Sequence, residues 1–473
     1  MTGPFDVVII GSGPAGVAVA ERLYEDLPDV TIALIERGST LLRRHFYANG
    51  ASISERDRFL TRYRVCPWKG DLSEGGALLP ALGGRGIVGG SQLHRFYTCD
   101  FTLWPNGLWP LDEGDLDPYF REAEIRLLAG SRSGGPAQDH VCKTLADLNA
   151  RHPPCGPTLN AERGPNGGVP HRSSVQRLLA LLDSDRVAPT RRLRIFAGTR
   201  ALRMVEDTAR PRRISRVRCV SVGGFRVPIG AQFDVQGTYF VLAASAVESA
   251  RLVLASGLET LAGYSSNVGK YLTEHIYCRG YLDVSGREEM THGSVNVFIP
   301  PRSTDLENRF QIELCSVTNA SDGRSLLRVT GSAAMDPQPD NRVTLSASCV
   351  DGHGMPRALT VLRLSPGDER RQIALLHGLQ SVAERLGCGW LAEPEVLPRG
   401  ASYHEAGTLR IAHSPLEGAA APDGLLFGLE NVFTGDGSAF PSVGVANPIL
   451  TLTAMGYRLA SRLNGLLRAC EHA

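Results

Sequence analysis

The chain opens on a pattern typical of a parallel β-α-β unit. Residues 5–10 (FDVVII) form a short run in which nearly every position is apolar, as in a strand that is buried on both faces. A glycine-rich turn and a helical segment from Ala15 to about Glu25 follow, and a second apolar run, Thr31–Ile35, ends at Glu36. About 30 residues in this order predict a strand, a helix and a parallel strand.

The period of the apolar residues changes along the rest of the chain. Alternation with a period of two dominates residues 276–364 and predicts an antiparallel sheet, and strands are also expected within 194–243. Residues 131–171 hold many Gly, Pro and His without a period, so we expect an irregular excursion there. Helical segments are predicted at 112–128, 174–183, 245–256, 368–387 and 449–467, and a further short strand at 431–434.

The turn between the first strand and the first helix reads GSGPAG, the G-x-G-x-x-G pattern of dinucleotide-binding sites. Gly11 allows the tight turn, Gly13 lets backbone N–H groups approach a pyrophosphate, and Gly16 allows the helix to pack closely on the sheet. The helix N-terminus then faces the phosphates. The carboxylate of Glu36 can accept hydrogen bonds from ribose hydroxyls, which argues against the 2′-phosphate of NADP. The turn follows a strand, opens a helix and precedes an acidic residue at the expected distance, and this combination argues against a glycine-rich turn without a binding role. The predicted cofactor contacts are Gly11, Gly13, Pro14, Ala15, Gly16 and Glu36.

A second turn near the C-terminus favours FAD over a nicotinamide cofactor. Residues 431–437 (NVFTGDG) are typical of a strand that runs into a Gly-Asp turn. The turn contains Gly435 and Asp436. The Asp436 carboxylate can accept a hydrogen bond from a ribityl hydroxyl, while the backbone N–H groups that follow it face the flavin phosphates. A Gly-Asp pair alone is more often only a turn, so the prediction of FAD depends on both motifs together.

Composition and charge exclude several classes of function. The 50 Lys and Arg residues balance 49 Asp and Glu, so no basic surplus points to nucleic acid or to an anionic membrane. No apolar run approaches the roughly 18–20 residues of a membrane span. The N-terminus lacks a signal-peptide pattern, so we expect a soluble, cytoplasmic protein. The ten cysteines form no CxxC pair, which indicates free thiols and no structural metal.

The two turns are part of a longer series of motifs in which the chain resembles the glucose–methanol–choline (GMC) oxidoreductase family. The resemblance runs almost from end to end, with the motifs in the order of the family. The stretches that carry it are GSGPAG at 11–16, GIVGGSQLH at 86–94, WPLDEGDLDPYFREAE at 109–124, FVLAASAVESARLVLAS at 240–256, NVGKYLTEH at 267–275, NRVTLS at 341–346, SYHEAGTLR at 402–410 and the long stretch 431–460.

The resemblance implies an α/β fold of two domains, an architecture similar to that of p-hydroxybenzoate hydroxylase. A Rossmann-like FAD-binding domain is expected from three separated segments, residues 1–130, 190–272 and 400–473. A substrate-binding domain of α+β type, built on an antiparallel sheet, is expected from residues 131–189 and 273–399. The active site is expected between the two domains, where pockets usually form.

The resemblance also implies the reacting residues. Family members carry a His and a second His or Asn beside the flavin, and the matching positions here are His404 and Asn447. Hydride leaves a carbinol carbon only when negative charge can build on its oxygen, and a neutral imidazole suits the base that takes the hydroxyl proton. We therefore expect His404 to act as base while hydride passes to flavin N5. Asn447 would orient the hydroxyl and stabilise the developing alkoxide. The Asn447-Pro448 pair also suits a helix start, and both residues are expected at the cofactor.

The stretch at 86–94 offers further contacts to the flavin. Gly90 and Ser91 are expected at the cofactor, and GGSQLH resembles the pyranose oxidase branch, in which the matching His is linked covalently to the flavin. Arg95 replaces the aromatic residue expected next. Covalent FAD through His94, a non-covalent contact to the isoalloxazine ring and a packing role all stay open. The remaining histidines that we considered are expected to have no catalytic role, and these are His140, His152, His171, His275 and His353.

The likeness to the sugar-oxidising branch favours a polyhydroxylated alcohol as substrate, such as a sugar, glycoside, aminosugar or cyclitol. The predicted partners are this small molecule, an electron acceptor (O₂ or another) and further copies of the chain in a homo-oligomer. Three alternatives stay open: a lyase or decarboxylase of the same family with a resting flavin, an oxidase of a less polar alcohol, and a nicotinamide dehydrogenase, against which the Gly-Asp turn speaks.

Overall fold

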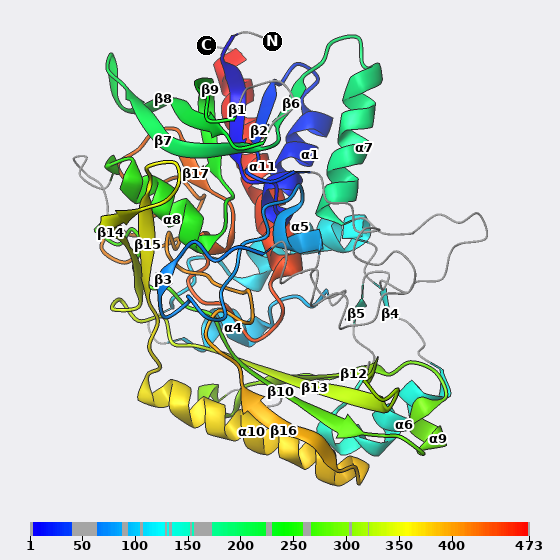
Figure 1. Ribbon diagram of the computed structural model, residues 1–473. Helices are drawn as coiled ribbons and strands as arrows, with labels where there is room; N and C mark the ends of the chain where they lie inside the picture. The colour runs from blue at the N-terminus through cyan, green and yellow to red at the C-terminus, as the bar shows by residue number, and fades with distance from the viewer. Residues whose placement is uncertain are drawn as a thin grey trace.

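Two sheets organise the molecule (Figure 1). One is mainly parallel and lies with helices α1 (Pro14–Asp26) and α11 (Ile449–Glu471) near the two termini, and the other is antiparallel and carries α10 (Pro366–Leu386) along one face. The computed structural model describes residues 3–39, 64–87, 93–104, 107–127, 130–131, 135–151, 154–155, 173–223, 229–258, 266–301, 305–319 and 321–471.

The first sheet contains seven strands among the described residues. Strand β1 pairs in parallel with β2 and β9, β2 pairs with β6, and β9 pairs with β17, whereas β8 lies between β7 and β9 and is antiparallel to both. The predicted strand, helix and parallel strand at the N-terminus are thereby confirmed. The bounds of the strands are β1 (Phe5–Ile10), β2 (Ile32–Ile35), β6 (Leu193–Phe196), β7 (Thr199–Asp207), β8 (Arg210–Ser221), β9 (Gln232–Leu242) and β17 (Val432–Thr434).

Strand β1 is buried on both faces, as its unbroken apolar run predicts. Val7 and Ile9 pack with α1, α11 and α7 (Ser174–Val187) on one face, while Val8 and Ile10 belong to the larger core on the other. Burial of apolar surface on both faces is the main force that holds this layer together.

The second sheet is antiparallel, as the period-two pattern predicts, with strand order β11-β12-β13-β10-β16. Helix α10 lies close against it, because a Cβ added at Gly331 of β13 would come within 2.5 Å of Leu375. Cys278 of β10 pairs with Gly331 and therefore faces α10, so Tyr277 and Arg279 point to the opposite face. The bounds are β10 (His275–Asp283), β11 (Asn296–Ile299), β12 (Gln311–Thr318), β13 (Ser325–Ala334) and β16 (Trp390–Val396).

One prediction within residues 131–171 is wrong, because α6 (Pro136–Thr144) is helical where the sequence predicts an irregular excursion. Pro136 suits the first turn of a helix, and Ala137 and Val141 are buried at the i, i+4 spacing of one helical face. The segment is too short, and too closely flanked by Gly and Pro, for this period to emerge from the sequence. The remaining elements are β3 (Lys69–Gly70), β4 (Gly130–Ser131), β5 (Pro154–Cys155), β14 (Arg342–Val350), β15 (Pro356–Val361), α4 (Thr98–Thr102), α5 (Glu113–Leu127), α8 (Ala246–Ala255), α9 (Glu288–Thr291), and the 3₁₀ turns η1 (Gly84–Ile87), η2 (Ala146–Leu148), η4 (Leu306–Asn308) and η5 (Gly437–Ala439).

The five predicted helices are confirmed as α5, α7, α8, α10 and α11, with small shifts at their ends. Helix α7 lies within the segment 131–189 assigned to the substrate-binding domain, yet it packs against α1 of the first sheet. The division into domain segments stays a prediction. In the described part of the chain, no helix combines the length and the apolarity needed to cross a membrane, and the cytoplasmic location also stays a prediction.

Candidate active site

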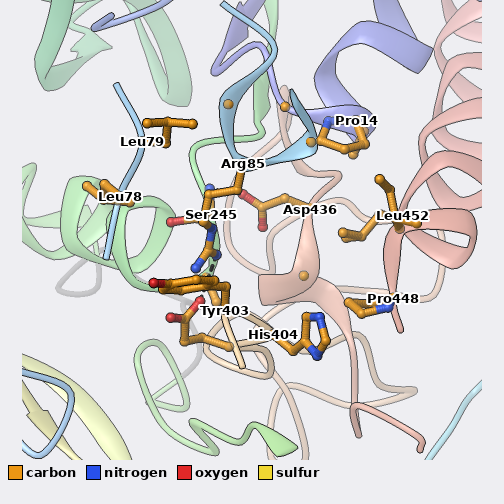
Figure 2. Close-up of a pocket in the computed structure, with 18 of the residues that line it drawn as sticks. Pro14, Leu78, Leu79, Arg85, Ser245, Tyr403, His404, Asp436, Pro448 and Leu452 are labelled. Atoms are coloured by element: carbon orange, nitrogen blue, oxygen red, sulfur yellow. Dashed lines mark hydrogen bonds and ion pairs between the residues drawn. The ribbon is translucent and has the colours of Figure 1, made fainter. Parts of the chain in front are cut away.

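A cavity of about 580 Å³ lies between the two sheets. Figure 2 shows Pro14 toward one end of this cavity, Asp436 in the middle and His404 toward the other end. The lining continues past His404 to Tyr277 and Arg328 of the second sheet. The predicted cofactor contacts that line the cavity are Gly11, Gly13, Pro14, Ala15, Glu36, Asp436, Asn447 and Pro448.

The glycine-rich turn leaves room for a phosphate group at the start of α1. Gly11 has φ +108°, and a Cβ there would come within 2.2 Å of the Ala243 carbonyl oxygen. At Gly13 an added Cβ would meet no protein atom within 4 Å, and no side chain caps the helix that follows. The first N–H groups of α1 therefore stay available to an anion at this end of the cavity. Gly16 does not line the cavity but brings α1 close to Gly11, whose carbonyl oxygen would lie 2.2 Å from a Cβ at position 16.

Glu36 follows β2 and fastens the same turn. Its Oε2 accepts hydrogen bonds from N (3.2 Å) and Oγ (2.6 Å) of Ser12, and its Oε1 accepts one from N of Gly38 (2.7 Å). Burial raises the pKa of Glu36, while these hydrogen bonds oppose the rise. Because a carboxylate offers about four acceptor sites, these three bonds leave one for a ribose hydroxyl.

Asp436 orders a second wall of the cavity. Its Oδ2 accepts hydrogen bonds from N of Ser245 (2.8 Å) and Oγ of Ser249 (2.6 Å), and its Oδ1 accepts one from N of Ser438 (2.8 Å). Ser245 has φ +85°, a backbone conformation that costs energy for a residue other than Gly. Its Oγ is buried without a hydrogen-bond partner among the described residues, although Ser245 lines the cavity. Such an orphaned hydroxyl fits a polar ligand group at this position. Sequence reasoning missed Ser245, whose only signal is its place at the end of a buried strand within 240–256.

His404 lies where the cavity meets the second sheet, and its ring contacts that of His275 at right angles, with 4.8 Å between centroids. The Nδ1 atoms of the two rings are 2.8 Å apart, and Nε2 of His275 lies 3.1 Å from the carbonyl oxygen of Gly444. Desolvation lowers the pKa of His275 to about 4, so this ring is neutral at neutral pH.

These contacts determine which nitrogen of His404 carries the proton and which carries the lone pair. A carbonyl oxygen only accepts, so Nε2 of His275 carries the proton and donates it to Gly444. Nδ1 of the neutral His275 ring is then an acceptor, and Nδ1–H of His404 must be the donor. The lone pair of His404 is therefore on Nε2. Sequence analysis gave His275 no catalytic role, and no local signal marks its contact with a residue 129 positions away.

The electrostatic surroundings keep His404 neutral. Desolvation, followed by electrostatic interactions with His275 and Arg85, lowers the pKa of His404 well below its usual value. Buried Glu405 pairs with Arg85, whose Nη2 lies 2.7 Å from its Oε2. Desolvation and the adjacent Glu405 raise the pKa of buried Glu274 to about 8. A neutral imidazole in such a site is ready to accept a proton.

Asn447 lines the cavity together with His404, and the adjacent Pro448 is buried just before α11. The side-chain nitrogen of Asn447 donates to Oε1 of Glu313, 2.9 Å away, which fixes the orientation of its amide. One N–H of the amide is left to donate to an oxygen in the cavity. The structure thus brings the two predicted reacting residues into one cavity, and it adds Glu313 as the group that orients Asn447.

The remaining predicted contacts do not line the cavity or lie outside the described residues. Gly435 packs beneath it, where an added Cβ would meet Leu459 at 2.8 Å. His94 is buried, and its ring packs on Phe298 with 4.2 Å between centroids. Its Nε2 has no hydrogen-bond partner in the described part of the structure. Gly90 and Ser91 are not among the described residues.

The mainly parallel sheet carries the glycine-rich turn of a dinucleotide-binding site, and a neutral histidine lies between it and the antiparallel sheet. These features are typical of a two-domain, dinucleotide-binding oxidoreductase. Residues 337–456 match the family model described as GMC oxidoreductase, and residues 6–61 match one described as lycopene cyclase protein. The segment 337–456 is therefore assigned to the C-terminal domain of GMC oxidoreductases.

Relatives and solved structures agree with this assignment. Paromamine 6′-oxidase of Streptomyces fradiae is 25% identical, with 98% of this chain and 91% of the relative covered. C-glycoside 3-oxidase of Microbacterium trichothecenolyticum is also 25% identical, with 97% and 96% covered. The fold is similar to that of pyridoxine 4-oxidase from Mesorbium loti (TM-score 0.68, 17% identity, 98% of this chain and 99% of that chain). It is similar, too, to that of formate oxidase from Aspergillus oryzae RIB40 (TM-score 0.73, 15% identity, 99% of each chain).

GMC oxidoreductases are FAD-dependent enzymes that act on CH–OH groups, and the residues of this cavity fit FAD. The open turn at Gly13 suits the pyrophosphate, Glu36 suits the ribose, and the orphaned hydroxyl of Ser245 suits a further hydroxyl or phosphate oxygen. When bound, FAD supplies the acceptor for a hydride. The protein residues must then bind the alcohol, orient it and take its proton.

Proposed function

We propose that this protein oxidises a carbinol of a polyhydroxylated substrate, such as a sugar, glycoside, aminosugar or cyclitol. The observation that carries the proposal is the neutral His404, whose Nε2 lone pair is left to the cavity that also contains the dinucleotide turn. Nε2 takes the hydroxyl proton, and Nδ1–H stays bonded to His275. The free N–H of Asn447 donates to the substrate oxygen and stabilises its growing negative charge.

The polar face of the second sheet supports a polyhydroxylated substrate. The cavity is lined there by polar side chains on adjacent strands, among them Tyr277, Asn296, Glu313 and Arg328. Such groups can donate or accept further hydrogen bonds to several hydroxyls of a polyol. The names of the relatives point the same way, since one oxidises paromamine and another oxidises C-glycosides.

Anaerobic mixing of the yellow holoenzyme with candidate alcohols tests this function. We expect at least one sugar, glycoside, aminosugar or cyclitol to bleach the flavin absorbance near neutral pH, because hydride transfer to the flavin removes that absorbance. Simple aliphatic and benzylic alcohols serve as the less polar comparison. Bleaching by these alone would replace the proposed substrate class, and a flavin that no alcohol bleaches would favour the lyase or decarboxylase. Oxygen uptake after bleaching would identify O₂ as the electron acceptor.

We further propose that His94 contacts FAD, through a covalent bond or without one, although its ring does not line the cavity formed by the described residues. Desolvation, then the charge of Arg151, lowers the pKa of His94 to about 4, so its ring is neutral and its Nε2 has no partner among the described residues. A neutral, unprotonated ring nitrogen is the nucleophile that such a bond requires.

Acid precipitation tests this attachment. If His94 carries the flavin, the yellow colour stays in the pellet of the wild-type protein and moves to the supernatant in His94→Ala. The exposed His377 of α10 gives a matched control, and His377→Ala should keep the colour in the pellet. Release of the flavin from the wild type by acid would leave His94 with a non-covalent or packing role.

A further inference from the structure

Two arginines lie on the cavity side of the second sheet. Arg279 of β10 and Arg328 of β13 both line the cavity. In the register of the two strands, Arg279 pairs with Thr330 and Tyr281 pairs with Arg328, so the two arginines are diagonal neighbours. Diagonal neighbours on one face have Cα atoms roughly 7–8 Å apart, within reach of one small group held between long side chains.

Neither arginine forms a hydrogen bond or an ion pair with the described residues. The Nε atom of each is buried without a partner, and the contact recorded for Arg279 is with the ring of Tyr277, 5.9 Å from its Cζ. Two fully buried arginines differ from this half-buried pair. Arg251 lies 2.5 Å from Asp351, and Arg309 lies 2.9 Å from Asp100.

The nearby carboxylate does not neutralise this pair. Glu313 is on β12, across Thr330 from Arg279. Its Oε1 accepts hydrogen bonds from Asn447 (2.9 Å) and from Gln311 (3.0 Å), and a single carboxylate cannot balance the charge of two guanidinium groups. Arg328 also interacts with Cys315, Tyr277 and Tyr281, and burial raises the pKa of Tyr277. The two guanidinium groups and one carboxylate leave a net positive charge in this part of the cavity.

Guanidinium nitrogens that are buried without partners are costly, and they are typical of sites that a ligand completes. We propose that Arg279 and Arg328 bind an acidic group, a carboxylate or a phosphate, on the substrate. The planar guanidinium pairs with either group through two parallel N–H···O bonds. This proposal rests on the proposed function and narrows it. The preferred substrate is an acidic polyol such as a uronic acid, a cyclitol acid or a sugar phosphate, and an aminosugar is disfavoured because its ammonium group would meet two like charges.

Binding of matched probes tests the proposal without turnover. The probes are glucuronate, galacturonate and quinate, each with its neutral amide, together with glucose 6-phosphate, glucose and glucosamine. Dissociation constants are measured from the change in flavin absorbance, in a His404→Gln background that blocks turnover. We expect at least one acid or the phosphate to bind about 10- to 100-fold more tightly than its neutral counterpart, as expected for charge-assisted hydrogen bonds. Comparison of the carboxylate probes with glucose 6-phosphate shows which of the two acidic groups the site prefers.

Variants of the two arginines test the assignment. Arg328→Gln and Arg279→Gln should each remove most of the preference for the acid, while Arg328→Lys, which keeps the charge, should retain part of it. Arg324 lies just before β13, its side chain is 46% exposed and it pairs with Asp322, so Arg324→Gln is the matched control and should keep the full preference. Flavin absorbance relative to protein shows that each variant is loaded.

The outcomes separate this proposal from the proposed function. Equal binding of every acid and its amide, or tighter binding of glucosamine than of glucose, overturns the acidic-group site, and so does a preference that survives both glutamine variants. The proposed function stands in that case if a neutral polyol still bleaches the flavin. Tight binding of an acid with no bleaching by any alcohol would instead support the anion site and contradict the oxidation.

Discussion

Replacement of His404 by Gln is expected to lower the rate of anaerobic flavin reduction by roughly 10²- to 10⁴-fold, the usual contribution of a positioned general base. Glutamine fills a similar volume and forms hydrogen bonds, but it cannot accept the hydroxyl proton. The yellow colour should be retained, because the dinucleotide turn and Glu36 lie toward the other end of the cavity. Stopped-flow measurement of the flavin absorbance at saturating substrate gives the rate directly.

The activity of the wild-type enzyme should also depend on pH in the way that the environment of His404 predicts. The pKa of His404 is lowered well below 6.5, first by desolvation and then by electrostatic interactions with His275 and Arg85. A histidine with a lowered pKa stays neutral, and therefore active as a base, while the pH falls through 6.5. We thus expect kcat/KM to stay constant through this pH range and to fall only in more acidic solution. A fall centred near 6.5 would contradict the proposed environment of His404.

His377 is exposed on α10, so the control variant His377→Ala should leave both the rate of flavin reduction and the pH profile unchanged. If His404→Gln, correctly loaded with FAD, reduced its flavin at the wild-type rate with the true substrate, the base would have to be another residue.

Replacement of His275 by Leu has the second largest expected effect, a loss of roughly 10- to 100-fold in the rate of flavin reduction, as for a small misplacement of a reacting group. Leucine removes the acceptor for Nδ1–H of His404, so the ring can rotate or move its proton to Nε2 and lose the base. The dissociation constant of the substrate should change little, because His275 positions His404 and does not line the cavity.

His275→Asn distinguishes this positioning role from a purely structural one. The Asn oxygen lies about as far along the side chain as Nδ1 of His, so it can accept from His404 and should restore part of the rate. A structural role predicts instead that Leu and Asn lower the FAD content and the thermal stability together, with the rate per bound flavin unchanged. That result would remove His275 from the mechanism.

Local patterns in the sequence were sufficient for most of the fold. An unbroken apolar run at 5–10, a period of two over 276–364 and a helical period at 449–467 each follow from which faces of an element are buried, and neighbouring residues alone carry that information. The helix at Pro136–Thr144 was missed because its few turns are too short for a period to stand out.

The dinucleotide turn could likewise be predicted, since Gly11, Gly13 and Glu36 act through a contiguous strand, turn and helix. The pair His404 and Asn447 came from a resemblance of motifs and not from spacing. Only the tertiary structure gave His275 its contact with His404 across 129 positions, and only the strand register made Arg279 and Arg328 neighbours without acidic partners. The physical reason is that such contacts depend on how distant elements pack and pair, whereas the sequence by itself records only which residues are buried along each element.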